Sequence, residues 1–210
     1  MLERLRQAFG IGRRPGAGAA ARWVVVDVET GGLDPARDPL LAIGAIAVVD
    51  ARIVVADSFE VLVRPPRTSS RDNILVHGIG EQAQQAGLAP AEACGRFVEW
   101  AGDAPLVAFH AAFDRAVLAR ATRGALGRAL PNPWLDLAEL APALHPGTGA
   151  RALDDWLQWA GVPVDQRHHA SSDAFATAML FVRLLAAVPA ERRDPAALRR
   201  LAAQARWVPR

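Results

Sequence analysis

Residues 23–32 are WVVVDVETGG, and this segment sets the expected architecture. Its first part is almost entirely apolar and rich in β-branched side chains, which favours a strand buried on both faces of a sheet. Residues two apart on a strand point to the same face, so Asp27 and Glu29 are expected to lie together where the apolar run ends. The segment therefore predicts a central strand that ends in a pair of neighbouring carboxylates.

The sequence that follows predicts a mixed sheet with helices. Two further apolar runs, 41–49 and 52–63, are separated by Asp50 and Ala51 alone, a spacing typical of a hairpin. Residues 64–80 are rich in Pro, Ser and Arg and are expected to be irregular. The remaining expected helices and strands, in chain order, are 90–102, 105–109, 111–126, 134–136, 137–144, 152–160, 171–188 and a solvent-facing helix at 195–206. A hairpin followed by strand–helix alternation predicts an α/β sandwich.

Length and composition agree with an ordinary globular protein. The 210 residues are 51% apolar and 22% charged, enough for one domain with a substantial core. No run approaches the roughly 18 apolar residues of a membrane span, and the N-terminus lacks the apolar stretch of a signal peptide. The single cysteine, Cys94, is expected in the core, since alone it makes neither an intramolecular disulfide nor a thiolate metal site. We therefore expect a soluble, cytoplasmic protein without a membrane partner.

The basic residues permit a nucleic-acid partner without requiring one. All 24 are Arg, whose planar guanidinium suits phosphate, although the absence of Lys also fits a GC-rich coding bias. They gather at 4–22, 115–128 and 192–210, where either a phosphate track or ordinary solvated surfaces would account for them.

The carboxylate pair itself points to a metal. Asp27 and Glu29 on one face of a strand end repel each other unless a cation lies between them. Their hard oxygen ligands suit Mg²⁺ or Mn²⁺. A solvated acidic turn at the end of a strand is the alternative that this segment leaves open.

Two later segments add further candidates. Asp114 falls in the first turn of the helix expected at 111–126, where the helix dipole favours an anion. His168 lies just before the helix expected at 171–188, and Asp173 lies within it, a division that suits a general base and a metal ligand respectively. Taken singly, each segment also fits a plain surface role.

The order of these motifs resembles the DEDDh (DnaQ-like) 3′-5′ exonucleases, the group that includes the proofreading, epsilon-like subunits of bacterial DNA polymerase III. The matching motifs are Asp27-x-Glu29-Thr30-Gly31, His110-x-x-Phe113-Asp114 and His168-x-x-x-x-Asp173, with His77-Gly78-Ile79 and Leu135-Asp136-Leu137-Ala138 between them. The family commonly has Asn after the first histidine of the second motif, and Ala111 stands here instead, a change that removes no metal ligand.

The resemblance implies a ribonuclease-H-like α/β fold, with a mixed central sheet and helices on both faces. By that likeness, Asp27, Glu29, Asp114 and Asp173 hold two Mg²⁺ or Mn²⁺ ions per active site. His168 acts as the general base, since imidazole takes up a proton near neutral pH. The implied reaction is hydrolysis of a nucleic acid from its 3′ end to nucleoside 5′-monophosphates.

The resemblance also indicates where substrate lies. The residues expected to contact the terminal nucleotide are Thr30, Gly31, Leu33, His110 and Phe113. Phe113 fits a core position equally well, and a structural role is the favoured interpretation of His77 and His110. Single-stranded DNA is the first expectation, with a role in proofreading or DNA repair and a DNA polymerase or other replication or repair protein as partner. An exoribonuclease of the same fold and a non-catalytic module that binds nucleic acid or a polymerase are the alternatives.

The likeness extends over about residues 23–185, which sets the expected domain limits. Residues 22–190 are assigned to the exonuclease domain. Residues 1–21 are expected to be a short amphipathic segment followed by a flexible Gly/Ala/Arg linker, and 191–210 a basic C-terminal helix or tail.

Overall fold

The computed structural model describes residues 22–163 and 169–204. The segment expected to be amphipathic and flexible, 1–21, and the histidine at 168 lie outside these described residues. The strands are β1 (Arg22–Thr30), β2 (Leu40–Val49), β3 (Arg52–Leu62), β4 (Leu106–Ala108) and β5 (Trp134–Asp136). The helices are α2 (Arg71–His77), α3 (Glu81–Ala86), α4 (Pro90–Ala101), α5 (Ala112–Leu126), α6 (Leu137–Leu144), α7 (Leu153–Ala160), α8 (Ala170–Leu185) and α9 (Pro195–Gln204), with a 3₁₀ turn η1 (Ala190–Arg192) before α9.

The five strands form one mixed sheet in the order β3-β2-β1-β4-β5, so the segment at 23–32 is central as expected. The first three strands are antiparallel neighbours, whereas β4 and β5 run parallel to β1. The hairpin turn at Asp50 and Ala51 is confirmed, with positive φ values of 51° and 56°. Positive φ at both turn residues is the geometry of the tight two-residue hairpin, whose twist matches that of the strands.

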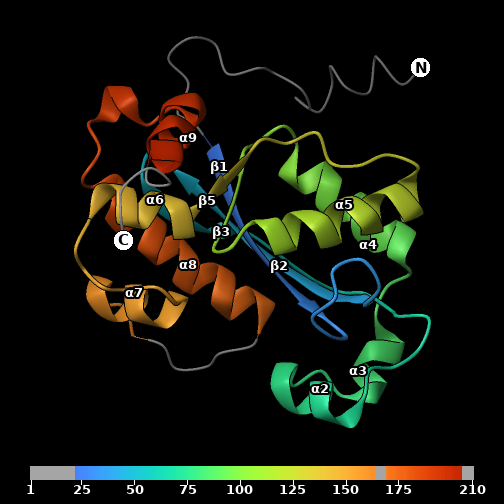
Figure 1. Ribbon diagram of the computed structural model, residues 1–210. Helices are drawn as coiled ribbons and strands as arrows, with labels where there is room; N and C mark the ends of the chain where they lie inside the picture. Colours follow the sequence, from blue (N-terminus) through green and yellow to red (C-terminus); the bar gives the residue numbers. More distant parts are fainter. Residues whose placement is uncertain (1–21, 164–168, 205–210) are drawn as a thin grey trace, which may run out of the picture.

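Alternation along β1 divides the core between the two faces of the sheet. Trp23 and Val25 belong to a cluster built with α6, α7, α8 and α9. Val24, Val26 and Val28 face the opposite way and pack with side chains of α4 and α5. Figure 1 shows the two groups of helices on either side of the sheet, and the expected fold class is confirmed.

The prediction that residues 64–80 are irregular was wrong, because this stretch contains α2. The hydroxyl of Ser70 caps its start by accepting from the N–H of Asn73 at 3.4 Å. Gly78 ends it with a left-handed φ of 69°, its N–H donating to the carbonyl of Ile74 at 2.8 Å. Two caps eight residues apart thus define a short helix that the surrounding Pro and Arg residues obscure. Together with α3, it lies at one end of the molecule (Figure 1).

The last helix is also more buried than expected. Leu198 and Ala202, four residues apart on α9, are fully buried and pack with side chains of α6. The expectation of a solvent-facing helix therefore holds for one side of α9 only, because i, i+4 apolar spacing gives it a core-facing stripe. Cys94 is buried in α4, as expected, and burial raises the pKa of its thiol. Among the described helices, none is long and apolar enough to cross a bilayer.

Candidate metal centre

Asp27 and Glu29 continue the row of β1 side chains that faces α8. Trp23 and Val25 of the same row lie in the α8-side core, and the two carboxylates follow where that core gives way to solvent, both half-buried. Asp27 lies directly opposite Gly44 of β2, and Glu29 lies opposite Ala42. The expected pair is therefore formed by strand alternation alone.

Asp173 completes a cluster of three carboxylates. It lies in the first turn of α8, is buried, and its N–H donates to the carbonyl of His169 at 2.9 Å. One carboxylate oxygen from each of Asp27, Glu29 and Asp173 lies within 4.8 Å of the other two. We call these three residues the carboxylate cluster; they come from positions nearly 150 residues apart, as the motif order requires.

Asp114 lies beside this cluster, on the α5 side of β1. Parallel pairing of β1 with β4 runs over Val24 and Val25, so Val28 lies beyond the paired residues. There its N–H donates instead to Oδ1 of Asp114 at 3.2 Å. Burial raises the pKa of Asp114 to about 7, hydrogen bonds from backbone N–H groups oppose the rise, and the charges of Asp136 and Glu29 add to it.

These residues fit a divalent cation. Three carboxylates within 4.8 Å of one another, with a fourth close to Glu29, concentrate negative charge in a partly water-excluded place. The ligand set is oxygen only, as the hard cations Mg²⁺ and Mn²⁺ prefer. A metal bound here would offset the repulsion and favour the ionised form of Asp114.

Hydrogen bonds from several segments hold the turn after β1 in place. The hydroxyl of Thr30 donates to the carbonyl of Gly32 at 2.6 Å. Gly31 donates its N–H to Pro39 at 2.9 Å and accepts from the side-chain amide of Asn73 in α2. Both polar backbone groups of Gly31 are thus engaged inside the protein, and they hold the shape of the turn.

The same turn holds an apolar side chain in solvent. Leu33 is 92% exposed, the most exposed large apolar side chain among the described residues. Arg120 of α5 donates to the carbonyls of Pro35 and Asp38, and the carboxylate of Asp38 accepts from the N–H of Asp34 at 2.8 Å. The Leu33 side chain therefore packs into no core, and its contact with a base stays a prediction.

The other two expected contact residues lie in the turn between β4 and α5 and at the start of α5. His110 is exposed, has a left-handed φ of 59°, and lies with its ring against that of Phe109 at 4.8 Å between centroids. Phe113 is half-buried against the α4–α5 core. The His110 side chain is therefore accessible to a ligand. The Phe113 ring is partly packed in the core and partly exposed to solvent.

Sequence reasoning assigned no role to Asp136, which proves central to this turn. Its Oδ1 accepts from the N–H of His110 at 3.0 Å and from the N–H of Ala138 at 2.9 Å. It therefore caps α6 and at the same time fixes the backbone that leads to Asp114. The available signal was an Asp directly before an apolar helical pattern. Burial raises the pKa of Asp136.

His77 is a structural residue, as expected. Its Nδ1 accepts from the N–H of Ile79 at 3.0 Å, so the neutral ring carries its proton on Nε2, 3.2 Å from the hydroxyl of Ser69. The side-chain amide of Gln84 donates to that hydroxyl at 2.7 Å and to the carbonyl of Ile79 at 2.8 Å. We call Ser69, His77 and Gln84 the polar network. Burial lowers the pKa of His77, which keeps the ring neutral.

Of the two adjacent histidines before α8, His169 is the one within the described residues. His169 is exposed at the start of α8, and its Cε1 lies 3.4 Å from where a Cβ on Gly78 would be. This imidazole therefore lies against the end of α2. His168, the expected base, is outside the described residues.

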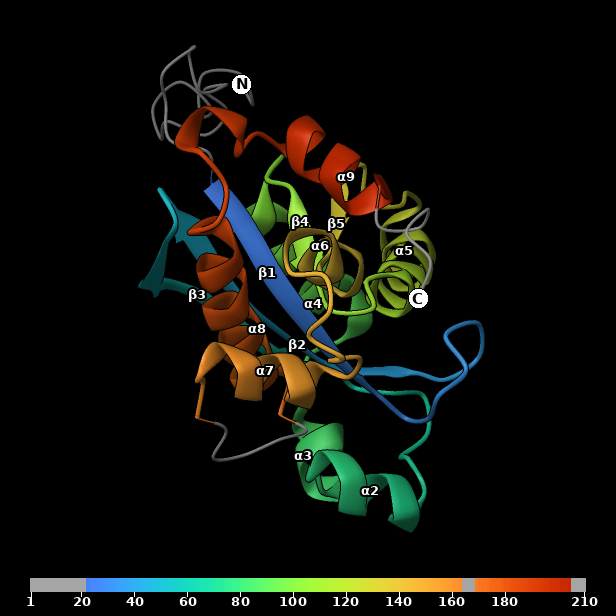
Figure 2. The same ribbon diagram turned by 60° about the vertical axis from the view of Figure 1, so that its left-hand side comes forward.

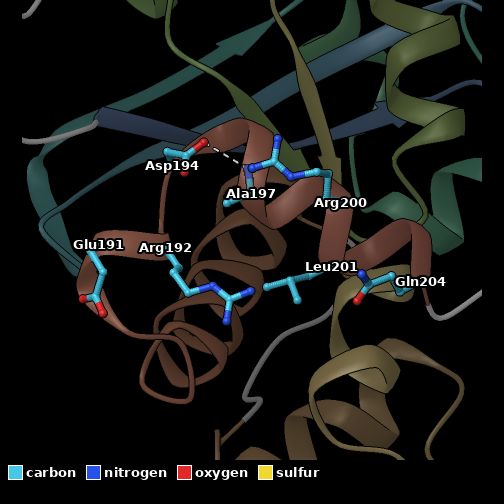
Figure 3. Close-up of a pocket in the computed structure, with 7 residues that line it drawn as sticks. All are labelled: Glu191, Arg192, Asp194, Ala197, Arg200, Leu201 and Gln204. Carbon is cyan, nitrogen blue, oxygen red and sulfur yellow. Dashed lines mark hydrogen bonds between the residues drawn. The ribbon is translucent and has the colours of Figure 1, made fainter.

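A separate hollow of about 250 Å³ lies between η1 and α9 (Figure 3). Its rim mixes Arg192 and Arg200 with Glu191 and Asp194, and the carboxylate of Asp194 accepts from the N–H of Ala197 at 3.0 Å. None of the elements that form it supplies a carboxylate of the cluster. The candidate chemistry thus lies at the cluster and not in this hollow.

Comparison with known proteins agrees with the motif order. The family RNase_T, described as Exonuclease, matches residues 24–181. A DNA polymerase III subunit epsilon-like protein of Rhodobacter capsulatus is 36% identical over 171 residues, which is 80% of this chain and 24% of that protein. A PolC-type DNA polymerase III of Bacillus subtilis is 32% identical over 78% of this chain and 11% of its own length. The chain thus spans a quarter or less of these relatives.

Solved structures share the fold over most of the chain. Exonuclease X, in complex with 5′ overhanging duplex DNA, is 25% identical with a TM-score of 0.66, covering 80% of this chain and 95% of its own. Escherichia coli exonuclease I, in complex with a dT13 oligonucleotide, is 20% identical with a TM-score of 0.66, covering 79% of this chain and 41% of its own. The expected ribonuclease-H-like architecture is confirmed.

Proposed function

This chain belongs to the RNase_T exonuclease family, and on that premise we propose that it is a metal-dependent enzyme that hydrolyses nucleic acids from the 3′ end. The observation that carries the proposal is the carboxylate cluster, with oxygens of Asp27, Glu29 and Asp173 within 4.8 Å of one another. A family member that had lost catalysis would have no need to keep like charges so close together.

In this proposal the four acidic residues divide the work of holding metal. Asp27, Glu29 and Asp173 provide the ligands of the main site, and Asp114, beside Glu29, supports a second ion. When bound, the two ions supply the positive charge that binds the scissile phosphate and stabilises the leaving 3′-oxygen. His168, five residues before Asp173, takes the proton from the attacking water, and a nucleoside 5′-monophosphate is released.

The terminal nucleotide is proposed to lie between the two turns that flank the cluster. Leu33 contacts its base from the turn after β1, which Thr30 and Gly31 hold in shape. His110 contacts it from the turn before α5, and Phe113 contacts it from the first turn of α5. The proposed substrate is DNA, which is supported by exonuclease X, a neighbour whose structure holds 5′ overhanging duplex DNA. That the strand is single-stranded is carried over from the motif resemblance and is left to the test below.

We extend the proposal to the setting in which the chain works. Its relatives are named as polymerase III proteins and are at least four times longer than the matched region. A DNA polymerase or another replication or repair protein is therefore the proposed partner.

The test uses oligonucleotides labelled at the 5′ end: single-stranded DNA, duplex DNA with a recessed end, and RNA, each with Mg²⁺ and with chelator. We expect a ladder of products shortened from the 3′ end with Mg²⁺, fastest on single-stranded DNA, and none with chelator. Asp173→Asn, which keeps the size of the side chain, serves as the inactive control. Shortening that survives chelation or this substitution would exclude the proposed site.

The base is tested by a matched pair of neighbouring histidines. His168→Ala should lower kcat by about 100-fold or more, since a positioned base contributes roughly 10²–10⁴-fold. Mn²⁺ affinity should be unchanged. His169→Ala, which removes an imidazole packed against the end of α2, should leave kcat within a few-fold of wild type. The opposite result would assign the base to His169.

A further inference from the structure

Gly44 is the one glycine in the five described strands, and it lies opposite Asp27. Glycine within a strand weakens it, because it loses more conformational freedom on folding and offers no side chain to pack. Its neighbours in β2 are all apolar and larger. The presence of glycine at this position therefore needs a structural explanation.

The start of α8 leaves no space for a side chain at position 44. A Cβ on Gly44 would lie 2.2 Å from the carbonyl carbon of Ala170 and 2.2 Å from the backbone nitrogen of Ser171. It would also lie 2.4 Å from the carbonyl oxygen of Ala170. All three atoms belong to the backbone, so no rotation of a side chain relieves the contact. The helix therefore rests on the bare backbone of β2.

The strand register shows what this close approach achieves. Asp27, Gly44 and Glu60 lie opposite one another on β1, β2 and β3, and directly opposed residues point to the same face. The first turn of α8 lies over this row, because the backbone of Ala170 and Ser171 comes closest to Gly44. Figure 2 shows α8 lying along one face of the sheet. At one end of the row, carboxylate oxygens of Asp173 and Asp27 lie within 4.8 Å of each other. In the middle, the helix backbone lies against Gly44. At the other end, the hydroxyl of Ser171 donates to the carboxylate of Glu60 at 3.1 Å.

We propose that Gly44 is a positioning residue for the metal centre: its missing side chain sets the depth at which α8 docks, and so the distance from Asp173 to Asp27. This inference rests on the proposed function of the carboxylate cluster. Non-bonded heavy atoms settle at about 3.5–4.0 Å, so a methyl group at position 44 would push the helix backbone away by about 1 Å or more. Asp173 moves with the helix, whereas Asp27 stays with the sheet.

Such a shift should affect Mg²⁺ more than Mn²⁺. Mg²⁺ demands near-ideal octahedral geometry at about 2.0–2.1 Å, whereas a larger ion tolerates a displaced ligand better. A change in metal preference is therefore the signature of a positioning role, and a loss of general stability does not produce it.

The experiment compares Gly44→Ala with Gly124→Ala in the full chain. Gly124 lies in α5, and a Cβ there would have no neighbour within 4 Å, so it is the matched control. Mn²⁺ binding is followed by electron paramagnetic resonance, and cleavage of single-stranded DNA is measured with each metal. For Gly44→Ala we expect about 10-fold weaker Mn²⁺ binding and about 100-fold slower Mg²⁺-supported cleavage, part of which Mn²⁺ recovers. Gly124→Ala should match wild type.

Each outcome decides a separate claim. Wild-type protein that binds no Mn²⁺ would overturn the proposed metal function itself. Wild type that binds Mn²⁺, with Gly44→Ala equal to it in affinity and in metal preference, would overturn the positioning role alone.

If circular dichroism shows that Gly44→Ala does not fold, Ser171→Ala tests the same docking of α8 without added bulk. It removes the hydroxyl that bonds Glu60, and a few-fold loss of Mn²⁺ affinity at unchanged melting temperature is expected. Unchanged affinity would overturn the proposal.

Discussion

The carboxylate cluster and the polar network both place polar side chains inside the protein, at very different energetic cost. In the polar network His77 is neutral, and each of its ring nitrogens has a hydrogen-bond partner. Gln84 bonds Ser69 and Ile79 in the same way. Buried polar groups that are neutral and bonded cost little, so this network is a plain structural device that holds α2 and α3.

The carboxylate cluster, in contrast, brings together groups that are costly to hold close to one another. It gathers charges of one sign, and next to it burial raises the pKa of Asp114 to about 7. Carboxylates held so close repel one another unless a cation lies between them, and such clusters are a usual mark of residues kept for function. The contrast predicts that substitutions in the cluster remove activity and spare stability, whereas substitutions in the network do the opposite.

The largest expected effect is that of Asp27→Asn. This change removes a central ligand charge from the cluster, so exonuclease activity should fall by about 1000-fold or more. The melting temperature in chelator should be equal to or above that of wild type, because one of three neighbouring charges is gone. A strongly destabilised variant would mean that the cluster is structural, and the contrast between the two regions would be lost.

Asp114→Asn should separate activity from stability most clearly. Activity should fall by about 100-fold, since the charge that supports the second ion is lost. Asn still accepts the hydrogen bond from Val28 but carries no buried charge. In the absence of metal, the free energy of unfolding of the variant should therefore exceed that of wild type by about 1 kcal/mol or more above pH 7.

The sign of this gain follows from the pKa of Asp114. The folded value, about 7, lies above the ordinary 3.8, so ionising wild-type Asp114 costs stability as pH rises through 7. Denaturant unfolding in chelator at pH 5 and pH 8.5 measures the difference, which should be larger at the higher pH. An equal difference at both values would contradict the assigned pKa.

Gln84→Ala tests the other region. It removes three hydrogen bonds, two donated by the side-chain amide and one accepted from the N–H of Ser69 at 2.9 Å, so the free energy of unfolding should fall by about 2 kcal/mol. Mn²⁺ affinity and kcat should stay within about twofold of wild type, since no cluster ligand is touched. Loss of Mn²⁺ binding in a folded variant would show that the network supports the metal centre directly.

The smallest expected effect is a pH dependence of the protein's stability that arises from His77 in the polar network. Burial lowers the pKa of folded His77, so the unfolded chain takes up a proton first as pH falls below about 6.5. The free energy of unfolding should therefore fall between pH 7 and pH 5 because of His77. The pKa of His145 is lowered as well, so the measurement compares wild type with His77→Gln. A variant with the same pH dependence as wild type would remove His77 as its source.

Local sequence patterns predicted the elements that carry the cluster. The β-branched run in β1, the two-residue turn and the amphipathic α8 follow from side-chain chemistry within a few positions. Asp27 and Glu29 were found in the same way, because strand alternation is a local rule. Asp114 and Asp173 were placed at helix starts by apolar periodicity, and their meeting with Asp27 followed from family resemblance.

What the sequence did not predict depends on contacts between distant segments. Neither the docking of α8 on Gly44 nor the hydrogen bond that the N–H of His110 donates to Asp136 has a local signature. The α2 helix was missed because seven residues with two caps give little periodicity. The structural role of His77 became definite only through its hydrogen bonds with Ser69 and Ile79, both of which also bond Gln84 of α3.

The most direct test of the central claim is a crystal structure of this chain grown with Mn²⁺, with the ion located by its anomalous scattering. We expect an ion at about 2.0–2.3 Å from carboxylate oxygens of Asp27, Glu29 and Asp173. Millimolar Mn²⁺ that leaves those three side chains without an ion, or that binds only elsewhere on the protein, would contradict the account.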